Sequence, residues 1–154
     1  MTTVRTGRPL PVIDDVDTAG HWEAASRGAL AIRVCAECDA VLHMPVAYCR
    51  SCGSWRTDWE VVAPRGRIYS WTVVHRQIHP AFPAPYTLAL IELLDRPQAR
   101  LIGYLPGVPE LAAGRELVAG FVEIDGISLP EWRLVAEPVG TVAAVTPDRF
   151  PAGT

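Results

Sequence analysis

Apolar runs of strand length alternate with turn residues over the chain beyond residue 56. Prolines, glycines and aspartates separate these runs, and such residues are typical of turns between strands. Five or six strands at this spacing favour a small closed or partly closed barrel. We expect the strands at 57–63, 67–77, 86–94, 100–105, 116–124 and 132–137, together with a helical turn at 109–113 that ends at Gly114.

The N-terminal part predicts one short helix over residues 21–27. Asp17 or Thr18 can cap its first turn, because both side chains offer an oxygen to free backbone N–H groups. Gly28 can end the helix in a left-handed turn. Trp22 lies on the apolar face, so we expect the helix to dock through this indole ring.

Two of the expected strands are apolar on both faces. Residues 87–91 and 117–122 do not alternate between apolar and polar side chains, although a barrel strand with one face in water should do so. The second face must therefore be covered, either by the N-terminal helix or by another protein. The sequence leaves both possibilities open.

All four cysteines of the chain lie in two C-x-x-C pairs, Cys35 with Cys38 and Cys49 with Cys52. Such pairs, with a short excursion between them, place four thiolates within reach of one tetrahedral ion, and zinc prefers this sulfur geometry. Four thiolates leave no open position for water or substrate, so we expect a structural Zn²⁺ site. Asp39 stands where zinc knuckles often carry a glycine.

Charge and composition exclude several functions. The formal net charge is −3, so no basic surface for nucleic acid dominates. All fourteen basic residues are arginine, so no lysine is present to form a Schiff base. We expect no membrane span, since no apolar stretch approaches about 18–20 residues. Paired C-x-x-C motifs without an export signal indicate a metal site in a reducing compartment, so we expect a cytoplasmic protein.

A proline-rich loop over residues 75–85 carries His75 and His79. Histidine can act as an acid or a base at neutral pH. No neighbouring Ser, Cys or carboxylate motif completes a catalytic set, however, so a structural or interface loop is the favoured interpretation.

The aromatic residues suggest a second binding function, because barrels of this kind can stack single-stranded bases on aromatic rings. Arg65 and Arg67, on either side of Gly66, could receive a phosphate. The negative net charge and the lack of a glycine-rich phosphate motif argue against this interpretation. We expect the rings to serve the core and an interface. They are Trp55, Trp59, Tyr69, Trp71, Phe82, Tyr86 and Tyr104.

The ordered combination of these features resembles the DUF35 family over about residues 16–137. The most specific stretch is 66–75, which reads Gly-Arg-Ile-Tyr-Ser-Trp-Thr-Val-Val-His. Asp39, and His21 in place of a common aromatic residue, depart from the family pattern without breaking it. The remaining matching segments are the helix motif at 21–30, both cysteine pairs with Pro45 between them, Cys52–Ser54, Trp59, Pro85–Tyr86 and 111–122.

The resemblance implies a mainly β protein with an N-terminal helix, a rubredoxin-like zinc ribbon and a C-terminal five-stranded OB-fold barrel. It divides the chain into an N-terminal arm and helix at 1–29, a zinc ribbon at 30–56, an OB-fold at 57–138 and a C-terminal tail at 139–154. The tail shows little pattern, so we expect a mobile or partner-bound extension.

The resemblance also implies a non-catalytic accessory subunit. Similar proteins associate with thiolase-superfamily enzymes that act on CoA thioesters, either acyltransferases or the lipid-transfer-protein-type aldolases of steroid side-chain degradation. The composition agrees, because Claisen-type thiolysis needs a cysteine nucleophile and the expected zinc site takes every cysteine. The residues that we expect to face the partner or its CoA site are His75, Arg76, His79, Phe82, Tyr86, Arg65 and Arg67.

Three alternatives remain at this point. The partner could be a MaoC-like, hot-dog-fold enoyl-CoA hydratase, which would keep the role in acyl-CoA metabolism. The OB-fold could instead bind single-stranded nucleic acid, although none is expected from the charge. The chain could also be an enzyme in its own right that uses His75 or His79.

Overall fold

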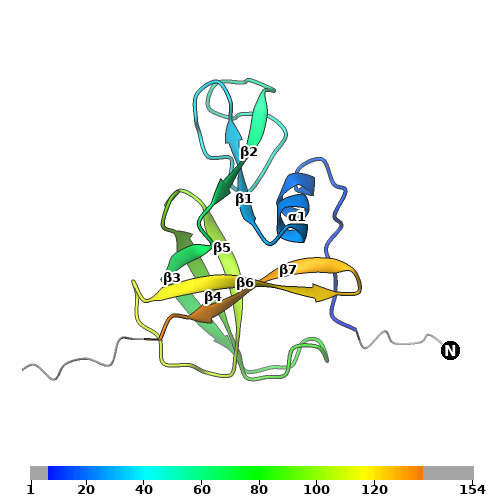
Figure 1. Ribbon diagram of the computed structural model, residues 1–154. Coiled ribbons are helices and arrows are strands. Elements are labelled where there is room, and N and C mark those ends of the chain that lie inside the picture. Colours follow the sequence, from blue (N-terminus) through cyan, green and yellow to red (C-terminus); the bar gives the residue numbers. More distant parts are fainter. Residues whose placement is uncertain (1–6, 137–154) are drawn as a thin grey trace, which may run out of the picture.

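The computed structural model describes residues 7–136 and shows a mainly β protein with one short helix. A small two-stranded unit stands above a curved five-stranded sheet, and the helix lies beside the junction of the two (Figure 1). The elements are α1 (Ala19–Ser26), β1 (Leu30–Cys35), β2 (Thr57–Val62), β3 (Arg65–Val74), β4 (Tyr86–Leu93), β5 (Arg100–Pro106), β6 (Glu116–Ile124) and β7 (Ile127–Leu134). The helix is not long and apolar enough to cross a membrane.

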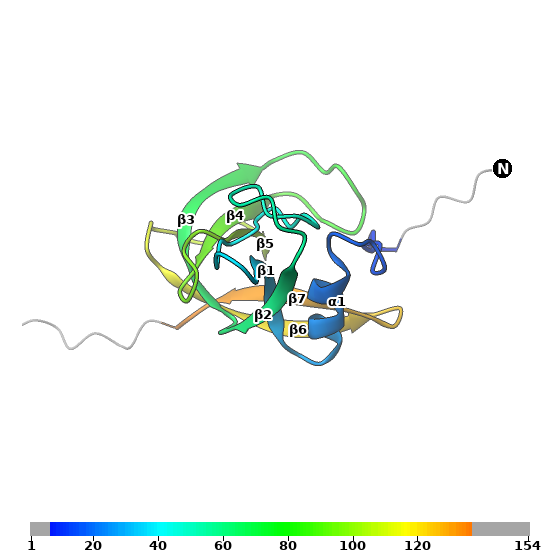
Figure 2. The same cartoon turned by 90° about the horizontal axis from the view of Figure 1, so that it is seen from above.

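The five-stranded sheet has the strand order β5-β4-β3-β6-β7, and all its pairs are antiparallel. β3 pairs with β4 from Gly66 to Val74 but with β6 only at Arg65–Arg67. A register shift between Ile68 and Ser70 bends β3 at this point, as β-bulges do. The sheet consequently curls on itself (Figure 2), and the expected OB-fold sheet of five strands is confirmed.

The hydrophobic core is shared between the two-stranded unit and the barrel. All six residues of β1 are buried. Leu30 and Ile32 of β1 belong to the same core cluster as Ile91 of β4 and Leu117 of β6. Because burying one such aliphatic side chain contributes about 1.5–3 kcal/mol, this contact anchors the ribbon stem to the barrel.

Helix α1 covers one side of the junction. Thr18 precedes it without a side-chain capping bond, and Gly28 ends it with a φ of 71°, which is the left-handed turn expected from the sequence. The helix packs on β1 and β7, with Ala24 and Ala25 buried. Its main contacts do not include β4 or β5, and Leu88 and Leu90, on the second apolar face of 87–91, are half-buried.

Three expectations about elements are corrected. The strand at 57–63 forms as β2, but it pairs with β1 and lies outside the five-stranded sheet. Residues 109–113 form no helical turn; the N–H of Gly114 donates to the carbonyl of Ile68 at 2.8 Å, which ties this segment to β3. The last strand begins at Ile127 rather than 132, because Pro130 is tolerated in a strand at the edge of the sheet. The tail at 139–154 lies outside the described residues.

Gly66 lies at the centre of the sheet, where the strands pack too tightly for a side chain. A Cβ atom at this position would lie 2.7 Å from the carbonyl oxygen of Glu92, and the backbone cannot move away because β3 pairs with both β4 and β6 here. We expect Gly66→Ala to lower the free energy of unfolding by about 1–3 kcal/mol, measured by urea denaturation. Gly7→Ala is the matched control, since no atom lies within 4 Å of its Cβ position, and equal stability of the two variants would contradict the prediction.

Candidate functional site

The four cysteines converge at the far end of the two-stranded unit from the barrel. Their sulfur atoms all lie within 4.8 Å of one another, and both the Cys35–Cys52 and the Cys38–Cys49 sulfur pairs are 3.6 Å apart. Zinc–sulfur bonds of about 2.3 Å in a tetrahedron place sulfurs about 3.8 Å apart. The donor set therefore fits one tetrahedral metal ion, as the spacing predicted.

The backbone of both knuckles has the same conformation. The N–H of Asp39 donates to the carbonyl of Cys35 at 3.0 Å, and the N–H of Gly53 donates to the carbonyl of Cys49 at 2.9 Å. Asp39 and Gly53 both adopt a left-handed conformation, with φ of 58° and 77°. Aspartate is one of the few residues other than glycine that enter this region readily, so Asp39 is compatible with a metal knuckle.

Arg96, in the turn between β4 and β5, holds the first knuckle to the barrel. Its guanidinium donates to both carboxylate oxygens of Asp39, at 2.8 and 3.0 Å, and to both of Glu60 on β2, at 3.0 and 2.6 Å. The hydrogen bonds from Arg96 lower the pKa of Asp39. Bidentate pairs of this kind fix geometry as well as charge, so the metal-binding end is oriented relative to the sheet.

The thiols of the cluster cannot all ionise on their own. The backbone N–H of Cys52 is the main cause that lowers the pKa of Cys49 to about 6. The N–H of Ala40 favours the Cys38 thiolate, but contacts with the Cys52 and Cys49 sulfurs outweigh it and raise the pKa of Cys38 to about 12. A divalent cation removes this repulsion, because metal ligands bind as thiolates. With four protein ligands, such a site is structural and performs no catalysis.

The predicted loop at 75–85 brings only some of its candidate residues together. His75 and Arg76 are exposed. His79 accepts a hydrogen bond at Nδ1 from the N–H of Ala81 at 3.1 Å, and its ring centre lies 6.2 Å from that of Phe82. No described contact joins His75 to a nucleophile or carboxylate, so these histidines form no catalytic set among residues 7–136.

Phe82 and Tyr86 belong to an aromatic cluster that the sequence did not reveal in full. Tyr104 of β5 lies 5.3 Å from Phe82 and 5.4 Å from Tyr86, measured between ring centres. Arg8 of the N-terminal arm stacks over Phe82 at 5.4 Å and bonds Glu131 at 2.8 Å. Tyr104 was expected among the core and interface rings, whereas the contact between Arg8 and Phe82 joins segments far apart in the sequence, and no local pattern predicts it.

Arg65 and Arg67 are at the start of β3, away from this loop, and each forms an ion pair with a carboxylate. Arg65 pairs with Glu116, and Arg67 binds Glu92 at 2.7 Å. Arg100 of β5 binds the second oxygen of Glu92 at 3.1 Å. Hydrogen bonds from Arg67 and then Arg100 lower the pKa of Glu92. Arg67, Glu92 and Arg100 thus form a ladder of ion pairs across β3, β4 and β5. Both arginines that the sequence suggested for binding a phosphate are therefore paired with carboxylates.

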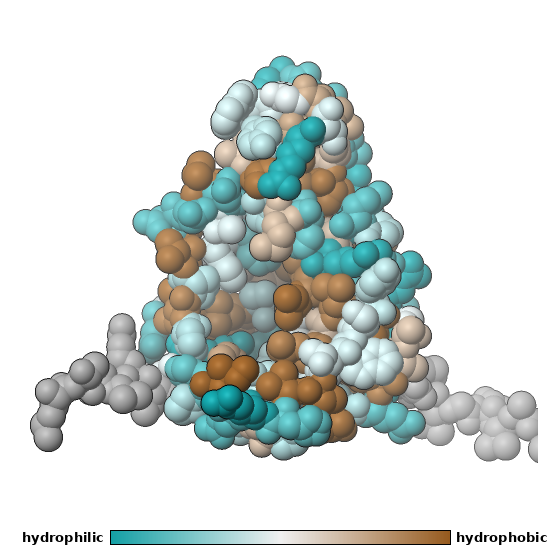
Figure 3. All heavy atoms as spheres, turned by 180° about the vertical axis from the view of Figure 1, so that it is seen from behind, coloured by the Kyte–Doolittle hydropathy of each residue, from teal (hydrophilic) through white to brown (hydrophobic). Residues whose placement is uncertain are grey.

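Between the ladder and the aromatic cluster lies an apolar surface that we call the outer sheet patch, made of Leu88, Leu90 and Ile102. The exposed fraction of Ile102 is 71%. Apolar side chains gather on this side of the molecule over the five-stranded sheet (Figure 3). Exposed apolar surface of this kind is typical of protein contact sites.

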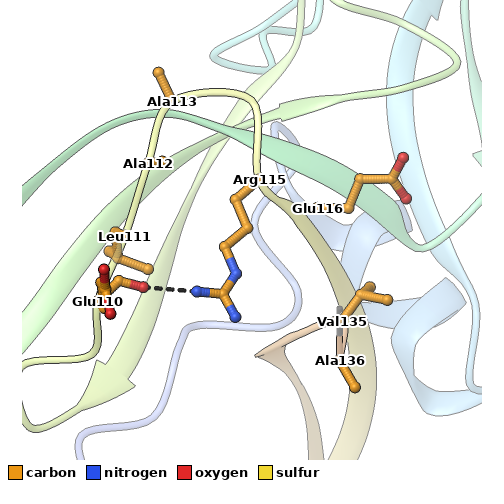
Figure 4. Close-up of a pocket in the computed structure, with 8 residues that line it drawn as sticks. All are labelled: Glu110, Leu111, Ala112, Ala113, Arg115, Glu116, Val135 and Ala136. Atoms are coloured by element: carbon orange, nitrogen blue, oxygen red, sulfur yellow. Dashed lines mark hydrogen bonds between the residues drawn. The ribbon is translucent and has the colours of Figure 1, made fainter. Parts of the chain in front are cut away.

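A separate hollow lies between the segment before β6 and the end of β7 (Figure 4). Arg115 extends across it, and its Nη1 donates to the carbonyl of Glu110 at 2.8 Å. The buried Nε of Arg115 has no partner among the described residues. The hollow brings together no nucleophile and base, since its other lining residues are Leu111, Ala112, Ala113, Glu116, Val135 and Ala136.

Comparison with known proteins places both parts of the chain in one family. Residues 22–56 match the ChsH2 rubredoxin-like zinc ribbon domain, and residues 59–125 match the ChsH2 C-terminal OB-fold domain. A probable enoyl-CoA hydratase alpha subunit of Thermomonospora curvata is 39% identical over 131 residues, which are 82% of this chain. The chain spans only 40% of the length of that relative.

A solved structure supports the same assignment. A chain of the Ltp2-ChsH2(DUF35) aldolase is 35% identical, with a TM-score of 0.71, over 82% of this chain and 98% of that chain. The four cysteines lie in the part that matches the zinc ribbon. The chain therefore belongs to the ChsH2 family of DUF35 proteins.

Proposed function

We propose that this chain is a non-catalytic accessory subunit that binds structural zinc and assembles with an enzyme acting on CoA thioesters. The observation that carries the proposal is the match over 98% of a chain whose structure is titled an Ltp2-ChsH2(DUF35) aldolase. The partner is a thiolase-superfamily subunit, and the reaction is carbon–carbon bond cleavage or acyl transfer. This chain stabilises the partner and helps to shape its substrate site.

The chemistry of the chain supports a non-catalytic role. Every cysteine lies in the metal cluster, and the basic residues are all arginine. The chain therefore has no free thiolate nucleophile and no lysine that could form a Schiff base. The hollow at Arg115 and the loop at 75–85 supply no paired acid and base. The nucleophile or base must then come from the partner.

The outer sheet patch and the loop at 75–85 are the surfaces that we assign to the partner and its CoA site. They adjoin each other through Phe82 and Tyr86, and His75, Arg76 and His79 lie on the same loop. Arg65 and Arg67 flank the opposite end of the sheet, where a partner carboxylate or a CoA phosphate would compete with Glu116 and Glu92. A metal site made of thiolates suits a reducing compartment, which supports our proposal of a cytoplasmic complex.

A hydratase partner is the second candidate. The relative from Thermomonospora curvata carries the name of an enoyl-CoA hydratase alpha subunit, and this chain matches two fifths of it. A MaoC-like hot-dog enzyme would then replace the thiolase-like subunit. Nucleic-acid binding is not expected, because Arg65, Arg67, Arg96 and Arg100 are all paired with carboxylates and phosphate contacts need free basic groups.

Loss of one metal ligand should abolish zinc binding. We expect the wild-type chain to carry one zinc ion, and Cys49→Ser to carry far less and to lose more than about 4 kcal/mol of stability, because metal loss is among the largest single-site effects. Metal content by plasma mass spectrometry and urea denaturation check this. Ser51→Ala, between the two ligands of the same knuckle, should keep its zinc. A wild-type chain free of zinc, or full zinc in Cys49→Ser, would contradict the site.

Charge placed on the outer sheet patch should break the complex. We expect Ile102→Asp to reduce the amount of partner that co-purifies with the tagged chain by at least about tenfold, because a buried unpaired carboxylate costs several kcal/mol. Val108→Asp is the control, as Val108 is also exposed, at 59%, but lies in the loop after β5. Equal recovery of the partner with both variants would remove the patch from the interface.

Identifying the co-purified subunit decides the reaction class. We expect mass spectrometry to find a thiolase-superfamily protein. If this protein has an active-site cysteine, acyl transfer follows, because that reaction needs the thiolate nucleophile; if it lacks one, aldol cleavage follows. A MaoC-like subunit would support the hydratase candidate instead. A chain that purifies from its host as a stable monomer would refute the accessory role.

A further inference from the structure

The second half of strand β3 has an unpaired edge. β3 pairs with β4 from Gly66 to Val74, whereas β6, on its other side, pairs with it only at Arg65–Arg67. Just beyond this point, the N–H and the C=O of Ile68 bond to the segment that precedes β6. Among the described residues, 70–74 have no backbone partner on this side. The edge of β3 is therefore open over this stretch.

The alternation of backbone groups along β3 shows which of them are open. The N–H and C=O of Ile68 point away from β4, since both bond to the segment before β6. In an antiparallel pair this direction alternates from residue to residue, and the register shift before Ser70 inserts one additional residue. The N–H and C=O groups of Trp71 and Val73 consequently point away from β4. They offer four hydrogen-bonding groups to a further strand.

The side chain of Trp71 also lacks a cover on the core side of the sheet. Trp71 lies opposite Ala89, which is buried in the core cluster. Residues that lie opposite each other share a face of the sheet, so the indole ring belongs to the core face. Its residue is nevertheless 42% exposed. A strand placed beside this part of β3 would cover the ring.

The residues of this edge favour pairing. Residues 69–74 read Tyr-Ser-Trp-Thr-Val-Val, and all but the serine are aromatic or β-branched, as is typical of strands. They include no charged residue and no proline, which are common means by which an edge strand avoids pairing. The edge is therefore a suitable template for one more strand.

The chain leaves the described residues in the direction of this edge. β3 and β7 both pair antiparallel with β6, so they run parallel to each other. Leu117 of β6 lies between Gly66 and Leu134, and Val135 still bonds to Glu116, the first residue of β6. A chain that continued straight from here would pass the start of β6 and follow β3 toward its open edge.

The hollow at Arg115 provides the space for this path. Val135 and Ala136 line the hollow, and residues 110–113, before β6, form another part of its wall (Figure 4). Its volume is about 780 Å³. The hollow lies beyond the start of β6, where this strand no longer separates β3 from the extension of β7.

Strand dimensions give the residues that reach the edge. Leu134 is level with Gly66 and lies two strand spacings from it, which is about 10 Å. Trp71 lies five residues further along β3, so a chain that continues from Leu134 is level with Trp71 at about residue 139. A sideways shift of one strand spacing, about 5 Å, then brings it next to β3.

The sequence that begins at this position suits a strand. Residues 139–146 read Val-Gly-Thr-Val-Ala-Ala-Val-Thr, in which five of the eight residues are β-branched. The segment has no charged residue, and Pro147 follows it, as is common at the end of a strand. Its length and composition therefore match the open edge.

We propose that residues 139–146 add to the open edge of β3 as a parallel strand. Their backbone pairs with the free groups of Trp71 and Val73, and the barrel gains a sixth strand that covers the indole ring of Trp71. This docking occurs within one chain, so it needs no partner and does not depend on the accessory role.

Hydrogen exchange of the Trp71 and Val73 amides, measured by NMR, tests the proposal. The full-length, zinc-loaded chain is compared with a chain that ends at Ala136. We expect both amides to exchange at least about tenfold faster in the shortened chain, because they lose their hydrogen bonds. The amide of Ile68, which donates to Arg115 at 2.8 Å, should stay protected and show that the barrel is folded. Equal exchange in the two chains would overturn the proposal.

Substitutions by proline test the strand in the full-length chain. Val142→Pro and Ala143→Pro are made separately, because the N–H groups of neighbouring strand residues point to opposite sides and proline removes one of them. At least one variant should reproduce the fast exchange, and these variants serve if the shortened chain does not fold. A chain that ends at Thr146 is the control and should keep the slow exchange. Fast exchange in this control, or slow exchange in both proline variants, would refute the assignment.

Other occupants of the edge give different results. If a second copy of the chain covers it, protection of Trp71 and Val73 rises with protein concentration and persists in the chain that ends at Ala136. If the partner subunit covers it, protection appears only in the co-purified complex. Either result would contradict the docking of residues 139–146.

Discussion

Mutual repulsion among four crowded thiolates is the constraint on which this structure depends. The sulfurs lie within 4.8 Å of one another, so they can all ionise only around a cation. A metal ion bound by these sulfurs would organise the two knuckles, which join the ends of β1 and β2. The other end of this two-stranded unit is buried in the barrel core through Leu30, Ile32 and Val62. Metal binding and barrel packing therefore support each other through one pair of strands, with Arg96 as a second connection.

This use of the cysteines also limits what the chain can do. The cysteines are committed to the metal cluster, and several charged groups on the sheet are paired with each other, as in the ladder of Arg67, Glu92 and Arg100. The outer sheet patch and the aromatic cluster beside it remain as surfaces that can contact another molecule. Such features recognise other molecules without changing them, which is consistent with an accessory subunit.

Features set by residues close together in the sequence were predictable, whereas contacts between distant segments were not. The spacing of the cysteines indicated their cluster, and Gly28 indicated the end of the helix. The pairing of β2 with β1 was missed because strand propensity does not say which strand is the neighbour. Pro130 concealed most of β7, since a proline signals a strand end unless the strand lies at an edge. The aromatic cluster combines residues 8, 82 and 104, and no local pattern could have joined them.

The central claim is that this chain assists catalysis without performing it. It is tested most directly by measuring turnover of the CoA substrate by the purified partner with increasing amounts of this chain. The account predicts little turnover by either protein alone and a rise that saturates at the stoichiometry of the isolated complex. Full activity of the partner alone, or turnover by this chain alone, would contradict it.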